Sequence, residues 1–251
     1  MTTDETNQQS PFTRPGFLIA AAFVVILIVV GIVLGVTAMN RDDTPQAVEP
    51  STTDAVEGPT TSAPPSDEAT DTEGCQVPGE TDTGSLTTAP EAVWEYQGTM
   101  AYPSSETFGP TETTDEGVRT CFQRSPEGAL FAAANGAVQA SDSQLIEPWL
   151  KYFLAEGPNR DAFLNAGPGG SGDTSGIRAR IAGFRMLAFD GKTANVDVAL
   201  QASTEGQTIL MSSVYTLIWE NGDWKLTMQD PSSPVDFATI PDLAGYTIWG
   251  E

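Results

Sequence analysis

The chain has 251 residues and no histidine, and its formal net charge is −23 at pH 7. The lack of histidine excludes Ser-His-Asp and Cys-His catalysis and the usual zinc sites, so we expect no catalytic site, metal or cofactor. Residues 42–118 hold 17 acidic residues and no lysine or arginine, whereas residues 119–251 hold 15 acidic and 9 basic residues. No basic stripe is available to neutralise phosphates, so we expect no nucleic-acid partner.

The first two segments predict a tail and a membrane span. Residues 1–16 are polar and predict a short disordered tail. Residues 17–39 contain no charged side chain, and as a helix they would extend about 34 Å, enough to cross a hydrocarbon core of about 30 Å. We therefore expect a single transmembrane helix. Two alternatives are weaker, because the apolar run is longer than a signal-peptide core and lacks the polar stripe of a helix in a globular domain.

The orientation of this helix depends on features outside it, because Arg14 precedes it and Arg41 follows it. Two cysteines and a long Ser/Thr/Pro-rich stretch downstream favour export of the C-terminal body. We expect residues 1–16 in the cytoplasm and the body outside it, at the cell membrane. Within the helix, Gly31 and Gly35 form a small-xxx-small pair that could be a helix-dimer face.

Residues 40–89 are rich in Thr, Ser, Pro and acidic residues, which predicts a disordered linker. Residues 90–251 are predicted to form one extracytoplasmic domain. Cys75 lies in the linker and Cys121 just before the first helix of the domain, and two cysteines in an exported chain most often pair. The expected disulfide would close a loop of about 45 residues and contribute about 4 kcal/mol.

Three helices are predicted at the start of the domain. In the first, Ser125 is placed as the N-cap, Pro126 fits the first helical position, and Glu127 favours the positive helix end. The second carries a broad apolar stripe. The helices are expected over residues 126–141, 145–154 and 159–166.

Four strand-like runs follow, over residues 177–189, 194–201, 207–219 and 224–228. In the first run the apolar phase changes around Gly183, which predicts a bulge and a curved strand. Hairpin turns are expected at Asp190-Gly191 and Asn221-Gly222. Helices followed by an antiparallel sheet predict an α+β domain, with three helices packed on a curved four-stranded sheet.

This order of elements resembles the cone-shaped nuclear-transport-factor-like fold. Three stretches make the resemblance more specific: GVRTCFQRSPEGALFAAAN at 117–135, VYTLIWENGDWKL at 214–226 and LAGYTIWG at 243–250. Together they resemble a family of single-pass actinobacterial membrane proteins that is associated with integrative conjugative elements.

The resemblance implies a membrane-anchored extracytoplasmic scaffold with protein partners, similar to the scaffold subunits of conjugative type IV secretion machines, that could form homo-oligomers. One alternative is a binding module whose cone pocket takes a lipid or a cell-wall precursor. A weaker alternative is an enzyme of the isomerase or cyclase type, with Asp197 and Tyr215 as candidate groups. Against it, Asp197 alternates with Asn195 and Gln201, which is typical of a solvated strand face.

Residues 230–251 carry apolar residues spaced by prolines. One interpretation is that they wrap back onto the sheet and are buried. The other is a partner-binding tail that presents Tyr246, Ile248 and Trp249.

Overall fold

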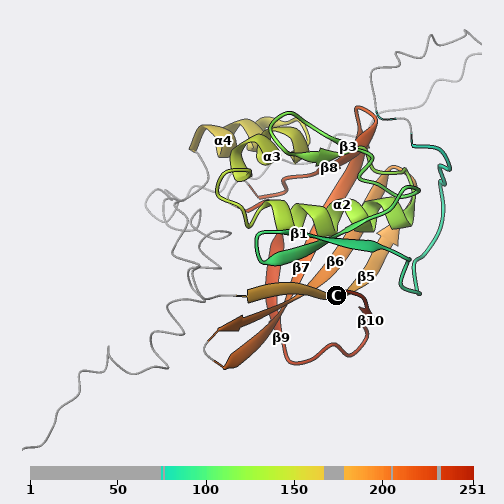
Figure 1. Cartoon of the computed structure of the whole chain (residues 1–251). Helices are drawn as coiled ribbons and strands as arrows, with labels where there is room; N and C mark the ends of the chain where they lie inside the picture. The colour runs from blue at the N-terminus through green and yellow to red at the C-terminus, as the bar shows by residue number, and fades with distance from the viewer. Residues whose placement is uncertain (1–74, 76, 167–177, 205, 231–232) are drawn as a thin grey trace, which may run out of the picture.

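The structure is a computed structural model that describes residues 75, 77–166, 178–204, 206–230 and 233–251 (Figure 1). The predicted tail at 1–16, the predicted membrane helix at 17–39 with Gly31 and Gly35, and linker residues 40–74 lie outside the described residues. No helix within the described ranges is long and apolar enough to cross a membrane.

Three helices are present in the described residues, as predicted: α2 (Pro126–Gln139), α3 (Ile146–Phe153) and α4 (Pro158–Ala166). The first strands precede them: β1 (Val93–Gln97), β2 (Met100–Ser104), β3 (Glu112–Thr113) and β4 (Arg119–Thr120). The other strands follow: β5 (Arg178–Phe189), β6 (Thr193–Thr204), β7 (Gln207–Glu220), β8 (Asp223–Leu226), β9 (Asp236–Ile240) and β10 (Thr247–Ile248).

The main sheet has six strands, all paired antiparallel, in the order β10-β5-β6-β7-β8 with β9 also paired to β7. Strands β1 and β2 form a separate hairpin, and β3 pairs with β4. The predicted domain fold, a four-stranded nuclear-transport-factor-like sheet under three helices, is therefore wrong. Strands β9 and β10 have five and two residues, too few to give a strand periodicity that the sequence would reveal.

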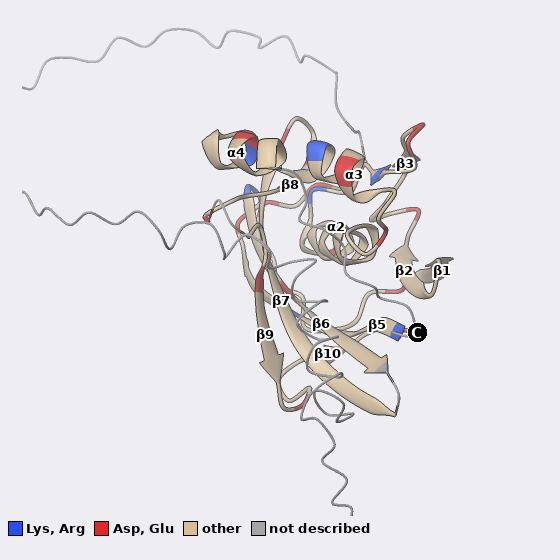
Figure 2. Ribbon diagram, turned by 90° about the vertical axis from the view of Figure 1, so that its left-hand side faces the viewer, with Lys and Arg blue, Asp and Glu red and all other residues tan. Residues whose placement is uncertain are grey.

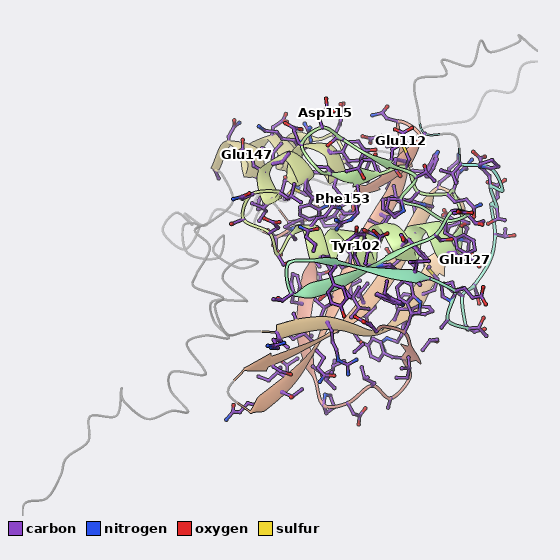
Figure 3. All side chains as sticks on the ribbon, in the orientation of Figure 1. Tyr102, Glu112, Asp115, Glu127, Glu147 and Phe153 are labelled. Carbon is purple, nitrogen blue, oxygen red and sulfur yellow. A yellow bond between two sulfur atoms is a disulfide. The ribbon has the colours of Figure 1, made fainter. Side chains whose placement is uncertain are left out.

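Helix α2 lies between the six-stranded sheet and the β1–β2 hairpin, and side chains fill the space on both sides of it (Figures 1 and 3). Its N-terminus has the predicted cap, because the Ser125 hydroxyl accepts the N–H of Gly128 at 3.0 Å and Pro126 follows the cap. A Cβ at Gly128 would lie 1.9 Å from the Gln123 carbonyl oxygen. Glycine at this position therefore allows the chain to turn tightly into the helix.

The predicted bulge in β5 is confirmed, since the pairing with β6 shifts register between Ile181 and Gly183. A Cβ at Gly183 would come 2.8 Å from the Thr247 carbonyl oxygen. The glycine thus allows β10 to pair closely with β5. This pairing brings the residue after β10, Trp249, into the core, where it is 5% exposed.

Residues 77–92, most of which fall in the predicted linker, contact the body in several places. Val77 is buried, Arg124 forms an ion pair with Asp82 at 3.2 Å, and the indole N–H of Trp249 donates to the Pro90 carbonyl at 3.0 Å. The segment between Cys75 and the β1–β2 hairpin is therefore attached to the domain along its length.

Candidate functional site

An open groove of about 520 Å³ lies between the β1–β2 hairpin and the first residues of β5. Its hairpin wall includes Trp94 and Tyr96, and its opposite wall includes Arg178 and Arg180 of β5 with Gln201 of β6. Ligand sites are typically concave and combine apolar surface with a few convergent polar groups. This groove is therefore the candidate binding site.

The aromatic wall comes from alternation along β1, because Trp94 and Tyr96 are two residues apart and share one face of the strand. The Trp94 ring meets the Trp249 ring edge-on, with centroids 5.1 Å apart. Tyr96 is 62% exposed, and its hydroxyl donates to the Glu251 carboxylate. One ring is thus fixed against the core, and the other offers its surface to a ligand.

Arg119 of β4 fixes the hairpin wall on α2. Its Nε donates to Asn135 Oδ1 at 2.6 Å, and its Nη1 donates to Gln97 Oε1 at 2.7 Å. The guanidinium also lies 3.8 Å from the centre of the Tyr102 ring. Arg119 is 8% exposed, and this burial lowers its pKa to about 10. Sequence reasoning missed this residue, because a single arginine in a two-residue strand gives no periodic signal.

The β5 wall supplies guanidinium groups. Arg180 donates to Gln201 Oε1 at 2.6 Å and to the Glu251 backbone oxygen at 3.4 Å. Arg178, two residues earlier, has no hydrogen bond or ion pair with the described part of the chain. Figure 2 shows basic positions in blue at this end of β5, beside the end of the chain. Of the two arginines that line the groove, Arg178 is thus the more available to a ligand.

These lining groups suit a ligand that combines carboxylates with apolar side chains. A guanidinium presents its donors in a planar fork that matches a carboxylate, and an aromatic ring offers a large apolar face. In the described ranges, no group of three or more cysteine or acidic residues could hold a metal ion.

The two groups considered for an enzymatic pocket lie on opposite faces of the sheet. The register pairs Val196 with Tyr215 and Asp197 with Val214, so Tyr215 faces α2 whereas Asp197 faces away from it. Tyr215 is 2% exposed, and burial raises its pKa. The pair therefore cannot act together on one substrate.

Asp197 is fully buried, although its polar strand neighbours predicted a solvated position. Its carboxylate accepts hydrogen bonds from the Ser212 hydroxyl at 2.7 Å, the Tyr246 hydroxyl at 2.8 Å and Arg185 Nε at 3.1 Å. The Arg185 guanidinium also covers the Tyr246 ring at 4.2 Å. This cluster fastens the segment before β10 to the outer face of the sheet.

The three residues considered for partner binding are not brought together. The Trp249 ring packs edge-on against Phe131 and Phe184, with centroids 5.3 and 5.7 Å away. Tyr246 is partly buried at Asp197, and Ile248 is 66% exposed. Of the three, Ile248 alone presents most of its surface to a partner.

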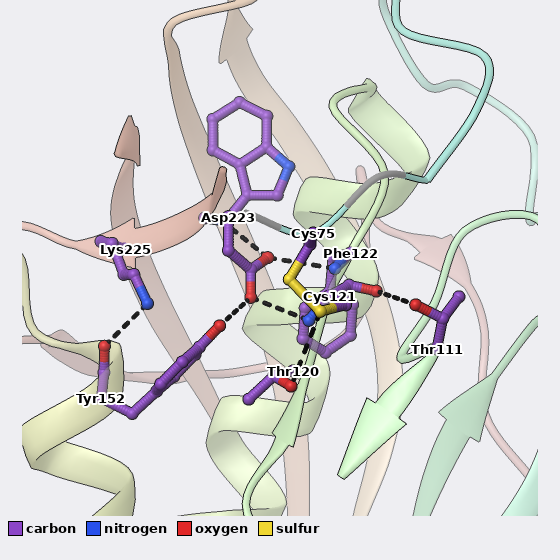
Figure 4. Close-up of a disulfide and its surroundings, with 9 residues drawn as sticks. Cys75, Thr111, Thr120, Cys121, Phe122, Tyr152, Asp223 and Lys225 are labelled. Atoms are coloured by element: carbon purple, nitrogen blue, oxygen red, sulfur yellow. Dashed lines mark hydrogen bonds between the residues drawn. A yellow bond between two sulfur atoms is a disulfide. The ribbon is translucent and has the colours of Figure 1, made fainter. Parts of the chain in front are cut away.

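The structure pairs Cys75 with Cys121, as predicted (Figure 4). Beside the disulfide lies Asp223, which is 1% exposed. Its carboxylate accepts the backbone N–H groups of Cys121 at 2.9 Å and Phe122 at 3.0 Å, and the Tyr152 hydroxyl at 2.7 Å (Figure 4). Asp223, which lies within the stretch VYTLIWENGDWKL at 214–226, therefore organises the backbone next to the disulfide.

Lys225 lies in the same cluster and is 7% exposed. Its ammonium group donates to the Tyr152 carbonyl at 3.0 Å and sits 3.2 Å from the centre of the Tyr152 ring. Burial lowers the pKa of Lys225 to about 8, although the nearby Asp223 acts in the opposite direction. Burial also raises the pKa of the Tyr152 hydroxyl, with Asp223 adding to the effect.

Comparison with known protein families shows which family the chain belongs to. Residues 54–248 match the family described as Domain of unknown function (DUF8175), and because this match covers most of the sequence, the chain belongs to that family. Comparisons with curated proteins and with solved structures gave no significant match. The family description gives no support for conjugation or secretion, and the described residues contain no membrane-spanning helix. We therefore correct the expectation of a role in conjugation or secretion.

Proposed function

We propose that this chain provides a protein-binding domain outside the cytoplasm, whose groove binds an acidic, extended segment of a partner protein. The observation that carries the proposal is that the guanidinium of Arg178, which has no partner among the described residues, lines the same groove as the exposed ring of Tyr96. The groove arginines would form charge-assisted hydrogen bonds with carboxylates of the partner segment. The aromatic rings of the groove would pack against apolar side chains of the same segment.

The composition of the groove favours a peptide over a polyphosphate. Its two arginines share the site with Glu251, whereas phosphate-rich ligands need a larger excess of basic groups. A peptide supplies both carboxylates and apolar groups on one chain. Such a ligand is consistent with a scaffold or assembly role, in which the domain binds another protein.

The disulfide supports a location outside the cytoplasm. Disulfides form and persist in oxidising compartments and are rare where glutathione and thioredoxin keep thiols reduced. Cys75 and Cys121 are paired across 46 residues of sequence. The bond joins the start of the described chain to the body that carries the groove.

The side chains that line the groove favour a binding function over a catalytic one. Its titratable side chains are Tyr96, Arg178, Arg180 and Glu251. The Glu251 carboxylate already accepts the Tyr96 hydroxyl, Arg180 donates to the Glu251 backbone oxygen, and among the described residues no cysteine or lysine lines the groove.

The test uses the purified full-length chain and a fluorescein-labelled peptide in which Asp alternates with Val, followed by fluorescence anisotropy. Replacing Arg178 with Glu should weaken binding by at least about tenfold, because a charge-assisted hydrogen bond is lost and repulsion replaces it. Lys192→Glu is the matched control, since it makes the same charge change at an exposed position outside the groove. Equal effects of the two substitutions, or no binding by the unmodified chain, would contradict the proposal.

A further inference from the structure

Strand β1 has one edge that is not paired within the described residues. It pairs with β2 in a register that places Trp94 opposite Pro103. The Pro103 carbonyl accepts a hydrogen bond from Asn135 Nδ2 of α2 at 2.9 Å, so its backbone points away from β1. Trp94 and Pro103 are therefore a non-hydrogen-bonded pair, in which Trp94 directs its N–H and C=O groups outward and Pro103, which has no N–H, directs its C=O group outward.

Alternation along the strand extends this result to Tyr96. Since backbone groups alternate between the two edges of a strand, Trp94 and Tyr96 both point to the open edge, whereas Glu95 points to β2. In the described part of the chain, no other strand, loop or side chain hydrogen bonds with the backbone of these two residues. The open edge thus presents two N–H donors and two C=O acceptors.

One ligand could contact both the open edge of β1 and the groove, because the same two residues form part of each. The side chains of Trp94 and Tyr96 line the groove, and their backbone groups form the open edge. A strand added to this edge would place the residues opposite Trp94 and Tyr96 on the groove side. Their side chains would then lie in the cavity that Arg178 and Arg180 line.

A second copy of this chain is a poor occupant of the edge. A symmetric pairing of two β1 strands through Trp94 and Tyr96 would put Glu95 directly opposite its own copy. Like charges in that position are destabilising. A charged residue on an exposed edge is also a common device against edge-to-edge association.

We infer that the partner's acidic segment binds as an added antiparallel β-strand on the open edge of β1. This inference deepens the proposed function and rests on it. Backbone hydrogen bonds to Trp94 and Tyr96 hold the segment, and its groove-facing residues carry the carboxylates that reach the arginines. The residue facing Glu95 on the other side of the strand is neutral or basic.

The test is an N-methyl scan of the Asp-Val probe peptide, measured by fluorescence anisotropy against the full-length chain. Methylation removes one backbone N–H at a time and leaves every side chain in place. Since successive N–H groups point to opposite edges, methylation at alternate positions should weaken binding about fivefold for each hydrogen bond lost, and methylation at the intervening positions should leave it unchanged.

Three outcomes separate the two claims. An alternating pattern supports strand addition. A flat pattern with retained sensitivity to Arg178→Glu shows that the peptide binds through its side chains, which overturns the inference and leaves the proposed function standing. No binding of the unmethylated peptide overturns both.

Discussion

The carboxylate of Asp223 accepts the backbone N–H of Cys121 at 2.9 Å, although 102 residues separate the two in sequence. The same carboxylate accepts the N–H of Phe122 and the hydroxyl of Tyr152. One buried acid therefore joins the β8 strand, the end of α3 and the disulfide-bonded loop.

The stability of the domain should depend strongly on this acid. Asp223→Ala leaves the buried N–H groups of Cys121 and Phe122 without an acceptor, and each unsatisfied group costs about 1–3 kcal/mol. We expect the free energy of unfolding in urea to fall by about 3 kcal/mol or more. Asp236→Ala is the control, because that residue is exposed on β9. Similar losses for the two variants would contradict the role given to Asp223.

Loss of the disulfide should also destabilise the domain. The bond spans 46 residues, and restricting the unfolded chain over such a loop contributes about 4 kcal/mol in the chain-entropy model. The variant with Cys75→Ala and Cys121→Ala should therefore melt at a lower temperature than the unmodified chain. A phosphine reductant should lower the melting temperature of the unmodified chain and leave that of the double variant unchanged. An effect on both would show that the reductant acts elsewhere.

Because of Lys225, the free energy of unfolding should increase with pH above about pH 8. Its pKa is lowered from 10.5 to about 8 in the fold by burial, so between these values the unfolded chain binds more protons than the folded chain. The free energy of unfolding therefore rises with pH through this window. Urea titrations from about pH 7 to about pH 9.5 avoid most tyrosine ionisation in the unfolded chain. Lys225→Met should flatten the slope, and an unchanged slope would assign the effect to another group.

Adjacent residues near the C-terminal end should differ sharply in their contribution to stability. Trp249 is 5% exposed and packs against three aromatic rings, whereas Ile248 is 66% exposed. Trp249→Ala should cost about 3–5 kcal/mol of unfolding free energy, and Ile248→Ala should change it by less than about 0.5 kcal/mol. Thermal or urea unfolding of both variants checks this, and a small loss for Trp249→Ala would argue that its indole does not belong to the core.

The parts of the fold that local sequence signals specify were predicted. The Ser125-Pro126 cap, the glycine-centred bulge at Gly183 and the pairing of the two cysteines each depend on a few neighbouring residues or on simple chemistry. Strands β9 and β10 were missed because they are short edge strands, held by backbone pairing with β7 and β5. Their residues carry no periodicity that distinguishes them from an irregular segment.

The candidate site could not be predicted for a related reason. Its walls come from β1 and β5, more than 80 residues apart in the chain, and neither wall carries a motif. In the sequence, Tyr96 is one of many scattered aromatic residues, and Arg178 follows a glycine-rich stretch that predicts a loop. The groove arises when Arg119 holds the hairpin against α2, which is a tertiary contact without a sequence signature.

The most direct test of the central claim is amide hydrogen exchange of the full-length chain with and without the Asp-Val peptide. Because an added strand would hydrogen bond with Trp94 and Tyr96, these two amides should exchange more slowly in its presence, and residues 178–181 should be protected with them. A control peptide in which Lys alternates with Val should protect neither region. Protection elsewhere in the chain, or equal protection by the two peptides, would contradict the binding of an acidic segment in this groove.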